Sequence, residues 1–422
     1  MKARIYPSLA DKTSIRLPSS KSLSHRAIIA AAAADGISHI TNIDYSADIE
    51  ATIEAMKHLG ARIEKHPHAL TIEGTSNFRY DKEVIDARES GSTLRFLIPL
   101  FTLFDTTISF TGSKRLFQRP LNVYEELFEK QGLTLKYTDN GITTGGKLKS
   151  GDIEIKGNIS SQFITGLLLT LPLVDGDSTI RITPPFESRS YVDLTLEILD
   201  TFGINAYYLD EYTIAVKGNQ HYQATDYEVE TDYSQLAFFA SLGLINNDIE
   251  CMNLNSDSKQ GDRVFIDIAE KMNGIIQRNV KSCLFKKSTL KGAEIDLSDC
   301  PDLGPMCFAL ASMADGESVF TGALRLRIKE SDRIAAMECE LRKLNQQIES
   351  DEGTVIVKGK RPLIALDTLD SHNDHRIVMA LSILATVSEN EVIIDHVEAI
   401  NKSYPCFFED LRKCNIRVEL YD

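Results

Sequence analysis

One pattern recurs six times along the 422 residues and strongly limits the folds that the chain can adopt. In each copy a polar cluster opens a short apolar helix, a turn rich in Asp, Gly or Asn follows, and a β-rich segment comes last. A solenoid repeat has roughly 20–50 residues, whereas successive copies here start about 70 residues apart. Each copy therefore has room for further elements. The copies begin at Ser19, Glu89, Ser160, Asp232, Pro301 and Asn373.

The residues that follow the first, third and fifth copies supply these further elements. Residues 48–59 predict a second helix that ends at Gly60, and the segments ARIEKH and ALTIEG predict a hairpin after it. The same order recurs after the helices predicted at residues 190–202 and 331–344. The predicted fold is thus α/β, with six βαβαββ units.

Six such units can form two similar domains of three units each. The midpoint falls near Asp232, where the fourth copy begins. We predict one domain over residues 20–231 and a second over residues 1–19 together with 232–422. The chain would cross between them at the short extended segments 17–19 and 229–231, although no Pro/Gly/Ser-rich linker marks either point.

The charge and the hydropathy of the chain exclude several classes of protein. The net charge of −15 argues against a nucleic-acid or membrane-surface binder, which needs a positive field. The N-terminus MKARIYPSLADK has no apolar core of a secretory signal, and no apolar stretch reaches the roughly 20 residues of a membrane span. We therefore expect a cytoplasmic protein. The start at Met1 and the short tail after Leu420 argue against a fragment of a larger fusion.

Cysteine and histidine do not indicate a metal centre. The seven cysteines show no CxxC spacing, so we predict neither a zinc site nor a disulfide framework. His372 and His375 are spaced to share one helix face, but a third ligand is not evident, and we predict no metal site.

The polar clusters at the predicted helix starts are the strongest candidates for chemistry. Lys21, Ser22 and Arg26 open an Ala-rich helix, whose free N–H groups and dipole favour an anion. Gly91 marks a close approach to the backbone, and the SSQ segment offers hydroxyl and amide groups to a phosphate or a polyol. Simple N-capping explains the fourth copy, and no P-loop motif occurs.

Arginine and lysine are placed at corresponding ends of the repeated units. Arg119 precedes Pro120 and is predicted to begin a helix, and further cations occur in KESDR, NDHR and NKSYP. Taken singly, each is compatible with a surface ion pair; together they predict one strongly anionic ligand between two halves of the protein. Among the acids, Asp302 follows Pro301 at a predicted helix start, and Glu330 follows Lys329. A carboxylate beside a cation is compatible with a structural role or with proton transfer.

Nine segments occur together in the order and spacing of a known family. On these segments the sequence resembles the enolpyruvyl transferases, in the branch that serves the shikimate pathway and so chorismate and aromatic amino-acid biosynthesis. The resemblance spans essentially the whole chain and implies two inside-out α/β barrels, each of three βαβαββ units. The segments are SSKSLSHRA, ESGSTLRFL, QRPL, ISSQF, SRSYVDLTL, PDLGP, RIKESDR, NDHR and NKSYP.

The resemblance also implies a reaction and a set of residues. Phosphoenolpyruvate would be joined to the 5-hydroxyl of shikimate 3-phosphate by addition and elimination, with release of phosphate and without a metal or an organic cofactor. Asp302 would accept the proton of the hydroxyl, and Glu330, with Lys21 or Lys402, would handle the proton at the methylene carbon. Shikimate 3-phosphate would be held by Lys21, Ser22, Arg26, Ser160, Ser161, Gln162, Ser188, Tyr191, Asp302 and Lys329. Phosphoenolpyruvate would be held by Lys21, Gly91, Arg119, Gln162, Arg333, Arg376 and Lys402.

Two other functions stay open. A sister enzyme that acts on UDP-N-acetylglucosamine carries a cysteine in the loop before its phosphoenolpyruvate-binding arginine, and the loop TGSKRLFQRP has none. A non-catalytic anion-binding relative would be expected to lose Asp302 or Glu330, and both acids are present.

Three positions depart from the usual pattern of the family: Arg325 and Glu89 stand where asparagine is common, and Phe96 where proline is common. We expect a monomer that binds two small anionic substrates.

Overall fold

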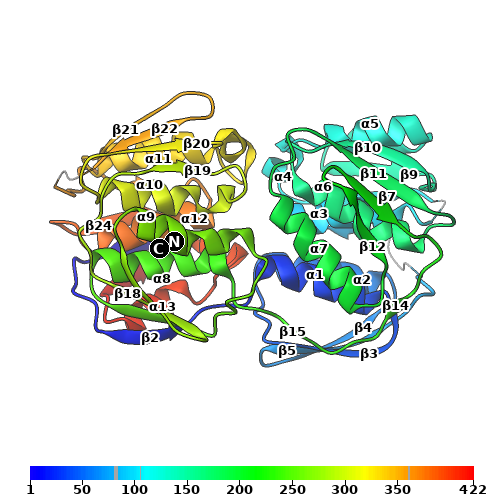
Figure 1. The fold of residues 1–422 in the computed structure, drawn as a ribbon, viewed down its shortest axis with the longest axis horizontal. Helices are drawn as coiled ribbons and strands as arrows, with labels where there is room; N and C mark the ends of the chain where they lie inside the picture. Colours follow the sequence, from blue (N-terminus) through cyan, green and yellow to red (C-terminus); the bar gives the residue numbers. More distant parts are fainter. Residues whose placement is uncertain (80–83, 105, 360–361) are drawn as a thin grey trace. The chain divides into compact units, whose positions relative to one another are not determined.

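The computed structural model describes residues 1–79, 84–104, 106–359 and 362–422, so Asp105, in the predicted turn of the second copy, lies outside the described residues. The chain forms two compact units (Figure 1). We call Ser19–Val229 the N-terminal unit, and Met1–Pro18 with Glu230–Asp422 the C-terminal unit. Each is built from three repeats, which confirms the predicted fold class.

In the N-terminal unit, each repeat places two strands beside one central strand, one parallel to it and one antiparallel. The first repeat comprises α1 (Lys21–Ala32), β3 (Ala34–Thr41), α2 (Ala47–His58), β4 (Arg62–His66) and β5 (Ala69–Gly74). The second comprises β6 (Val84–Asp86), α3 (Gly91–Phe101), β7 (Ile108–Thr111), α4 (Lys114–Gln118), α5 (Asn122–Gln131), β8 (Thr134–Thr138) and β9 (Gly141–Gly145). The third comprises β10 (Asp152–Lys156), α6 (Ser161–Thr170), the 3₁₀ turn η1 (Leu171–Leu173), β11 (Ser178–Thr183), α7 (Arg189–Thr201), β12 (Ala206–Asp210) and β13 (Thr213–Val216).

The end of the N-terminal unit completes its first repeat. The short strands β14 (Tyr222–Gln223) and β15 (Tyr227–Glu228) both pair parallel with β3. They supply the parallel neighbour that β6 and β10 supply in the other two repeats. The chain therefore returns to the beginning of this unit before it continues at Glu230.

The C-terminal unit repeats this arrangement. The fourth repeat comprises α8 (Tyr233–Ile245), β16 (Ile249–Met252), η2 (Gly261–Val264), α9 (Phe265–Lys271), β17 (Ile275–Arg278) and β18 (Ser282–Lys286). The fifth comprises β19 (Glu294–Asp296), η3 (Pro301–Leu303), α10 (Gly304–Ser312), β20 (Glu317–Thr321), η4 (Leu324–Ile328), α11 (Arg333–Lys343), β21 (Gln347–Ser350) and β22 (Val355–Lys358). The sixth comprises β23 (Leu369–Asp370), α12 (His375–Ala385), β24 (Val392–Asp395), η5 (Val397–Lys402), α13 (Phe407–Lys413) and β25 (Val418–Tyr421).

The first residues of the chain belong to two different sheets of the C-terminal unit. Strand β2 (Thr13–Arg16) pairs parallel with β16 and is the first strand of the fourth repeat. Strand β1 (Lys2–Ile5) lies antiparallel between β24 and β25 and completes the sixth repeat. These pairings explain why residues 1–18 belong with the second half of the chain.

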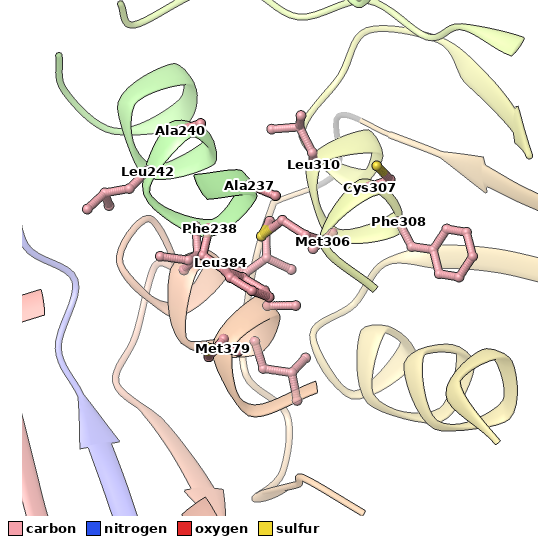
Figure 2. Packing of buried hydrophobic residues seen from close by; sticks show 14 of the residues in the cluster. Ala237, Phe238, Ala240, Leu242, Met306, Cys307, Phe308, Leu310, Met379 and Leu384 are labelled. Carbon is pink, nitrogen blue, oxygen red and sulfur yellow. The ribbon is translucent and has the colours of Figure 1, made fainter. Parts of the chain in front are cut away.

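Buried helices form the centre of each unit, and the sheets lie outside them. Every residue of α8, α10 and α12 is buried, as expected for helices that are apolar on all sides. Phe238, Met306 and Leu384 from these three helices face one another in Figure 2. The outer strands instead alternate buried and exposed residues, as in β10, so one face of each sheet meets solvent.

Serine and aspartate side chains cap the helices at the predicted polar clusters. Ser20, Ser90 and Ser160 accept hydrogen bonds from backbone N–H groups at the starts of α1, α3 and α6. Asp232 and Asp374 do the same for α8 and α12. The prediction that polar clusters open these helices is therefore confirmed. Among the described residues, no helix is long and apolar enough to cross a membrane.

Candidate active site

In the N-terminal unit, the first turns of α1 and α2 are joined by an ion pair. Lys21 is the first residue of α1, and its Nζ lies 2.8 Å from Oδ2 of Asp48 in the first turn of α2. Both side chains are largely buried. Lys21 is therefore held at the positive end of a helix, in a position suited to bind an anion.

Arg26 lies one turn further into α1 and is almost completely buried. Its Nε donates to Thr195 Oγ1 at 2.9 Å, its Nη1 to the Ser22 carbonyl at 2.7 Å, and its Nη2 to Tyr191 O and Thr165 Oγ1 at 3.0 and 3.1 Å. Burial lowers the pKa of Arg26 to about 10, so it stays charged at neutral pH. Arg26 thus joins α1 to α6 and α7 within the predicted substrate site.

Gly91 is the first residue of α3 and lies against two guanidinium groups. A Cβ atom at Gly91 would lie 2.7 Å from Nη1 of Arg119 and 2.8 Å from Nη1 of Arg95, closer than side-chain carbons are found. The close approach that the sequence predicted at Gly91 is present, and the neighbours are cations.

Arg119 corrects one sequence prediction. It does not begin a helix but caps the C-terminal end of α4, and α5 begins at Asn122. The following Pro120 explains the difference, because proline holds the preceding residue in an extended conformation, here with ψ 147°. Arg119 is buried rather than a surface residue.

Gln162 connects the first turns of α3 and α6. Its Nε2 donates to Ser92 Oγ at 3.1 Å, and its Oε1 accepts from Arg95 Nη1 at 3.0 Å. Arg95 also donates from Nη2 to the carbonyl of Pro120 at 3.0 Å and stacks over Phe163. Gln162 and its neighbours therefore lie beside the Gly91 backbone and Arg119.

The starts of α6 and α7 carry the remaining predicted residues of this unit. Ser160 caps α6, and Ser161 is its first residue. Ser188 precedes α7 in the left-handed region with φ 53°, which is unusual for serine and recurs at ligand sites. Tyr191, in the first turn of α7, is half-buried beside Arg26.

In the C-terminal unit, a second group of charges surrounds Asp302, which lies in η3 directly before α10. Its Oδ1 accepts from Arg333 Nη1 at 2.8 Å and from Lys329 Nζ at 3.1 Å. Its Oδ2 accepts from Arg376 Nη2 at 3.0 Å. We call Asp302 together with Lys329, Glu330, Arg333, Asp374 and Arg376 the Asp302 cluster.

Arg333 is the first residue of α11 and the most buried cation of the Asp302 cluster. Its Nη2 lies 2.7 Å from Glu330 Oε2, and its Nε lies 2.8 Å from Oδ2 of Asp374, the cap of α12. Arg376 also donates to Ser234 Oγ at 3.0 Å, in the first turn of α8. The starts of α8, α10, α11 and α12 therefore meet at one cluster.

Lys402 and Arg325 flank these helix starts. Lys402 donates from Nζ to the carbonyl of Asn373, which directly precedes Asp374. Arg325, in η4, donates to the carbonyl of Ser298. This backbone contact gives Arg325 a structural partner at the position where the family pattern differs.

The cations determine the ionisation of the acids. Burial would raise the pKa of Asp302, but Arg376, Lys329 and Arg333 outweigh it and hold that pKa well below its ordinary value. Burial likewise opposes ionisation of Asp374, and Arg333 again lowers the pKa below the usual range. Burial lowers the pKa of Lys329, with Asp302 opposing it. Asp302 therefore pairs with Lys329, Arg333 and Arg376 in the way that an anionic ligand would.

Sequence reasoning missed several residues that complete these two groups. Arg95 lies in the segment ESGSTLRFL, but its contacts with Pro120 and Gln162 could not be predicted, because those residues come from other elements. Asp48 and Ser234 were not singled out, because their partners lie in other elements. The N-cap signal of Asp374 was readable in NDHR, but its burial against Arg333 was not.

The fold of the chain is that of an enolpyruvyl transferase. The structure of EPSP synthase from Acinetobacter baumannii matches it with a TM-score of 0.83 and 25% identity over 100% of both chains. The enolpyruvyl transferase NikO from Streptomyces tendae has the same fold, with a TM-score of 0.81 and 15% identity over 99% of this chain and 98% of that one.

Sequence comparison defines the family more closely. The profile of EPSP synthase (3-phosphoshikimate 1-carboxyvinyltransferase) matches residues 9–411. The 3-phosphoshikimate 1-carboxyvinyltransferase of Clostridium kluyveri is 44% identical over 401 residues, or 94% of each chain. That of Clostridioides difficile is 41% identical over 99% of this chain and 98% of the relative. The chain belongs to the EPSP synthase family.

Proposed function

We propose that the chain transfers the enolpyruvyl group of phosphoenolpyruvate to the 5-hydroxyl of shikimate 3-phosphate and releases phosphate. Membership of the EPSP synthase family supports this reaction. The observation that supports it best in the structure is the gathering of cations and acids at the helix starts of each unit. Both substrates are multiply charged anions, which such helix starts are suited to bind.

We propose that both units contribute to one site. Lys21 and Arg26 of the N-terminal unit and Lys329 of the C-terminal unit would bind shikimate 3-phosphate. The hydroxyl and amide groups of the N-terminal unit would complete that subsite: Ser22, Ser160, Ser161, Gln162, Ser188 and Tyr191. Phosphoenolpyruvate would lie against the Gly91 backbone with Lys21, Arg119, Gln162, Arg333, Arg376 and Lys402.

In the proposed reaction, the 5-hydroxyl oxygen bonds to C2 of phosphoenolpyruvate while Asp302 accepts the hydroxyl proton. A proton is delivered to the methylene carbon by Glu330, with Lys21 or Lys402 beside it. The resulting tetrahedral intermediate then loses a proton from the new methyl group, and its bond to the phosphate oxygen breaks. The cations that hold phosphoenolpyruvate would stabilise the charge of the departing phosphate.

Substrate binding would also prepare Asp302 for this role. Lys329, Arg333 and Arg376 depress the pKa of Asp302 and so make it a weak base. Phosphate and carboxylate groups of the substrates would compete for Lys329, Arg333 and Arg376. As these cations turn to the substrates, the pKa of Asp302 would rise and proton transfer from the hydroxyl would become more favourable.

The test of this function is phosphate release with two alternative acceptors. Purified chain is incubated with phosphoenolpyruvate and either shikimate 3-phosphate or UDP-N-acetylglucosamine. Phosphate release with shikimate 3-phosphate alone supports the proposal. Release with the amino sugar would support the sister activity, and release with neither would support a non-catalytic relative.

We also propose that the working form is a cytoplasmic monomer. Cell fractionation tests the location, and sedimentation tests the oligomeric state.

A further inference from the structure

A separate group of ligating side chains lies on α11 and on the turn before α12 in the C-terminal unit, beyond the Asp302 cluster. It consists of Cys339, Glu340 and the ring of His372, whose ligand atoms all lie within 4.8 Å of one another. Glu340 is seven residues after Arg333 on the same helix, about 10 Å further along its axis. The residues of this group are therefore outside the proposed reaction site.

The fold holds Glu340 and His372 in place. His372 Nε2 lies 2.9 Å from Oε1 of Glu340, whose side chain is completely buried. The turn before α12 is fixed by two further bonds: the backbone N–H of Asp370 donates to Glu340 Oε2 at 2.9 Å, and the N–H of His372 donates to Asp370 Oδ1 at 2.7 Å. Cys339 precedes Glu340 on the helix and is exposed.

The structure also corrects the sequence prediction for the histidines. His375 is the buried first residue of α12, whereas His372 lies in the turn before that helix with φ 52°. The two therefore do not share a helix face. The two other ligating side chains near His372, Cys339 and Glu340, come from α11, which lies beside the turn in space but more than 30 positions away in sequence.

We propose that Cys339 Sγ, His372 Nε2 and the Glu340 carboxylate bind a divalent transition-metal ion of the zinc class. A thiolate with an imidazole favours Zn²⁺ or Co²⁺ over Mg²⁺ and Ca²⁺, which prefer oxygen ligands alone. Three protein ligands leave a fourth tetrahedral position to water. Sequence reasoning had predicted no metal site in this chain.

Lys343 would compete with a metal ion for the carboxylate of Glu340. Its Nζ lies 3.0 and 2.9 Å from the two oxygens of Glu340, and the side chain is partly exposed. The ion would therefore bind Oε1 of Glu340 and Nε2 of His372 in place of the hydrogen bond between them, while Lys343 turns toward solvent. By joining α11 to the turn that leads into Asp374, the ion would fasten two elements that also carry the Asp302 cluster.

Cobalt is the probe that reports thiolate ligation directly. The full chain, freed of metal with a chelator, is titrated with Co²⁺, and the expected result is a thiolate-to-cobalt charge-transfer band that saturates at one equivalent. Cys339→Ser should abolish the band, and His372→Gln should weaken Co²⁺ binding roughly tenfold or more. Cys406→Ser is the matched control, because Cys406 is the other exposed cysteine and the remaining ones are buried.

Zn²⁺ should displace Co²⁺ and remove the band, whereas excess Mg²⁺ should not. A band that survives in Cys339→Ser, or that disappears in Cys406→Ser, would overturn the assignment. So would the lack of a band and of Zn²⁺ retention in the unsubstituted chain. Circular dichroism of each variant, together with the independent His372→Gln result, separates loss of a ligand from loss of the fold. Phosphate release is measured separately, so that the proposed reaction and the metal site can fail independently.

Discussion

Arg376 donates from Nη2 to Oδ2 of Asp302 at 3.0 Å, which ties the proposed proton acceptor to a residue proposed to bind phosphoenolpyruvate. Arg333 makes the same connection to the other oxygen of Asp302 at 2.8 Å. Binding of an anion and basicity of the acid would therefore be coupled, because both would depend on the same guanidinium groups. In the proposed reaction, the reactivity of Asp302 is a property of the whole Asp302 cluster.

Removing either acid should slow turnover while leaving substrate binding largely intact. Asp302→Asn removes the proposed proton acceptor, and Glu330→Gln removes the proposed proton donor, so kcat should fall about 10²–10⁴-fold in each. Steady-state phosphate release gives kcat, and calorimetry with shikimate 3-phosphate checks that binding remains. Asp299→Asn is the control, because Asp299 is exposed and close by in sequence. Near-normal kcat in either acid variant would remove that residue from the mechanism.

Gly91→Ala should weaken phosphoenolpyruvate selectively. The new methyl group would lie within 3 Å of Nη1 of both Arg119 and Arg95, so these cations must move. We expect the KM for phosphoenolpyruvate to rise about tenfold, equivalent to about 1.4 kcal/mol, with little change for shikimate 3-phosphate. Gly353→Ala is the matched control, since its Cβ would make only ordinary contacts with Leu324. Equal shifts in the two KM values would argue for general strain instead.

Asp374→Asn should destabilise the C-terminal unit. Asp374 is fully buried and paired with buried Arg333, and loss of its charge would leave a buried cation poorly compensated. We expect the free energy of unfolding to fall by about 3–5 kcal/mol. Urea denaturation of the variant and the unsubstituted chain measures this loss. Asp332→Asn is the control, because Asp332 caps α11 in the same way but is only half-buried, and asparagine caps equally well.

The stability difference between the unsubstituted chain and Asp374→Asn should depend on pH, because it depends on the ionisation of Asp374. The pKa of Asp374 is lower in the folded chain than the value of about 3.9 in an unfolded one, so its ionisation stabilises the fold above that value. The contribution is lost as the pH falls through the folded-state pKa. The gap between the unsubstituted chain and Asp374→Asn should therefore stay constant near neutral pH and narrow below about pH 4. A gap that widens on acidification would contradict the ion pair as its cause.

Local patterns in the sequence predict much of this fold. The caps at Ser20, Ser90 and Asp232 and the hairpin of β4 and β5 depend on residues close together in the chain, so they could be predicted. The places of β1 and β14 could not, because Lys2 pairs with Asp395 and Tyr222 with Ala34 across most of a unit. No local periodicity records such pairings.

The candidate site divides in the same way. Lys21 and Gly91 were identifiable because a charged or small residue at a helix start has a direct chemical meaning. The contacts of Arg95 with Gln162 and of Asp374 with Arg333 arise only when separate repeats pack together. Sequence therefore predicts where anions would bind, and the fold shows which acids pair with the cations.

If both units bind the substrates, they should draw closer together when ligands are present. We expect small-angle scattering to show a smaller radius of gyration with shikimate 3-phosphate and a phosphoenolpyruvate analogue than without them. Calorimetry under the same conditions shows whether the ligands are bound. An unchanged radius with bound ligand would count against a site that closes.

The most direct test of the account is the affinity of shikimate 3-phosphate for variants from each unit. Lys21→Met alters the N-terminal unit and Lys329→Met the C-terminal unit, and each removes a charge proposed to contact this substrate. Titration calorimetry should give a roughly 10- to 100-fold weaker Kd for both variants, while Lys358→Met, which alters an exposed ion pair, stays unchanged. If only one of the two variants weakens binding, shikimate 3-phosphate is held by a single unit, and the proposal of one shared site is wrong.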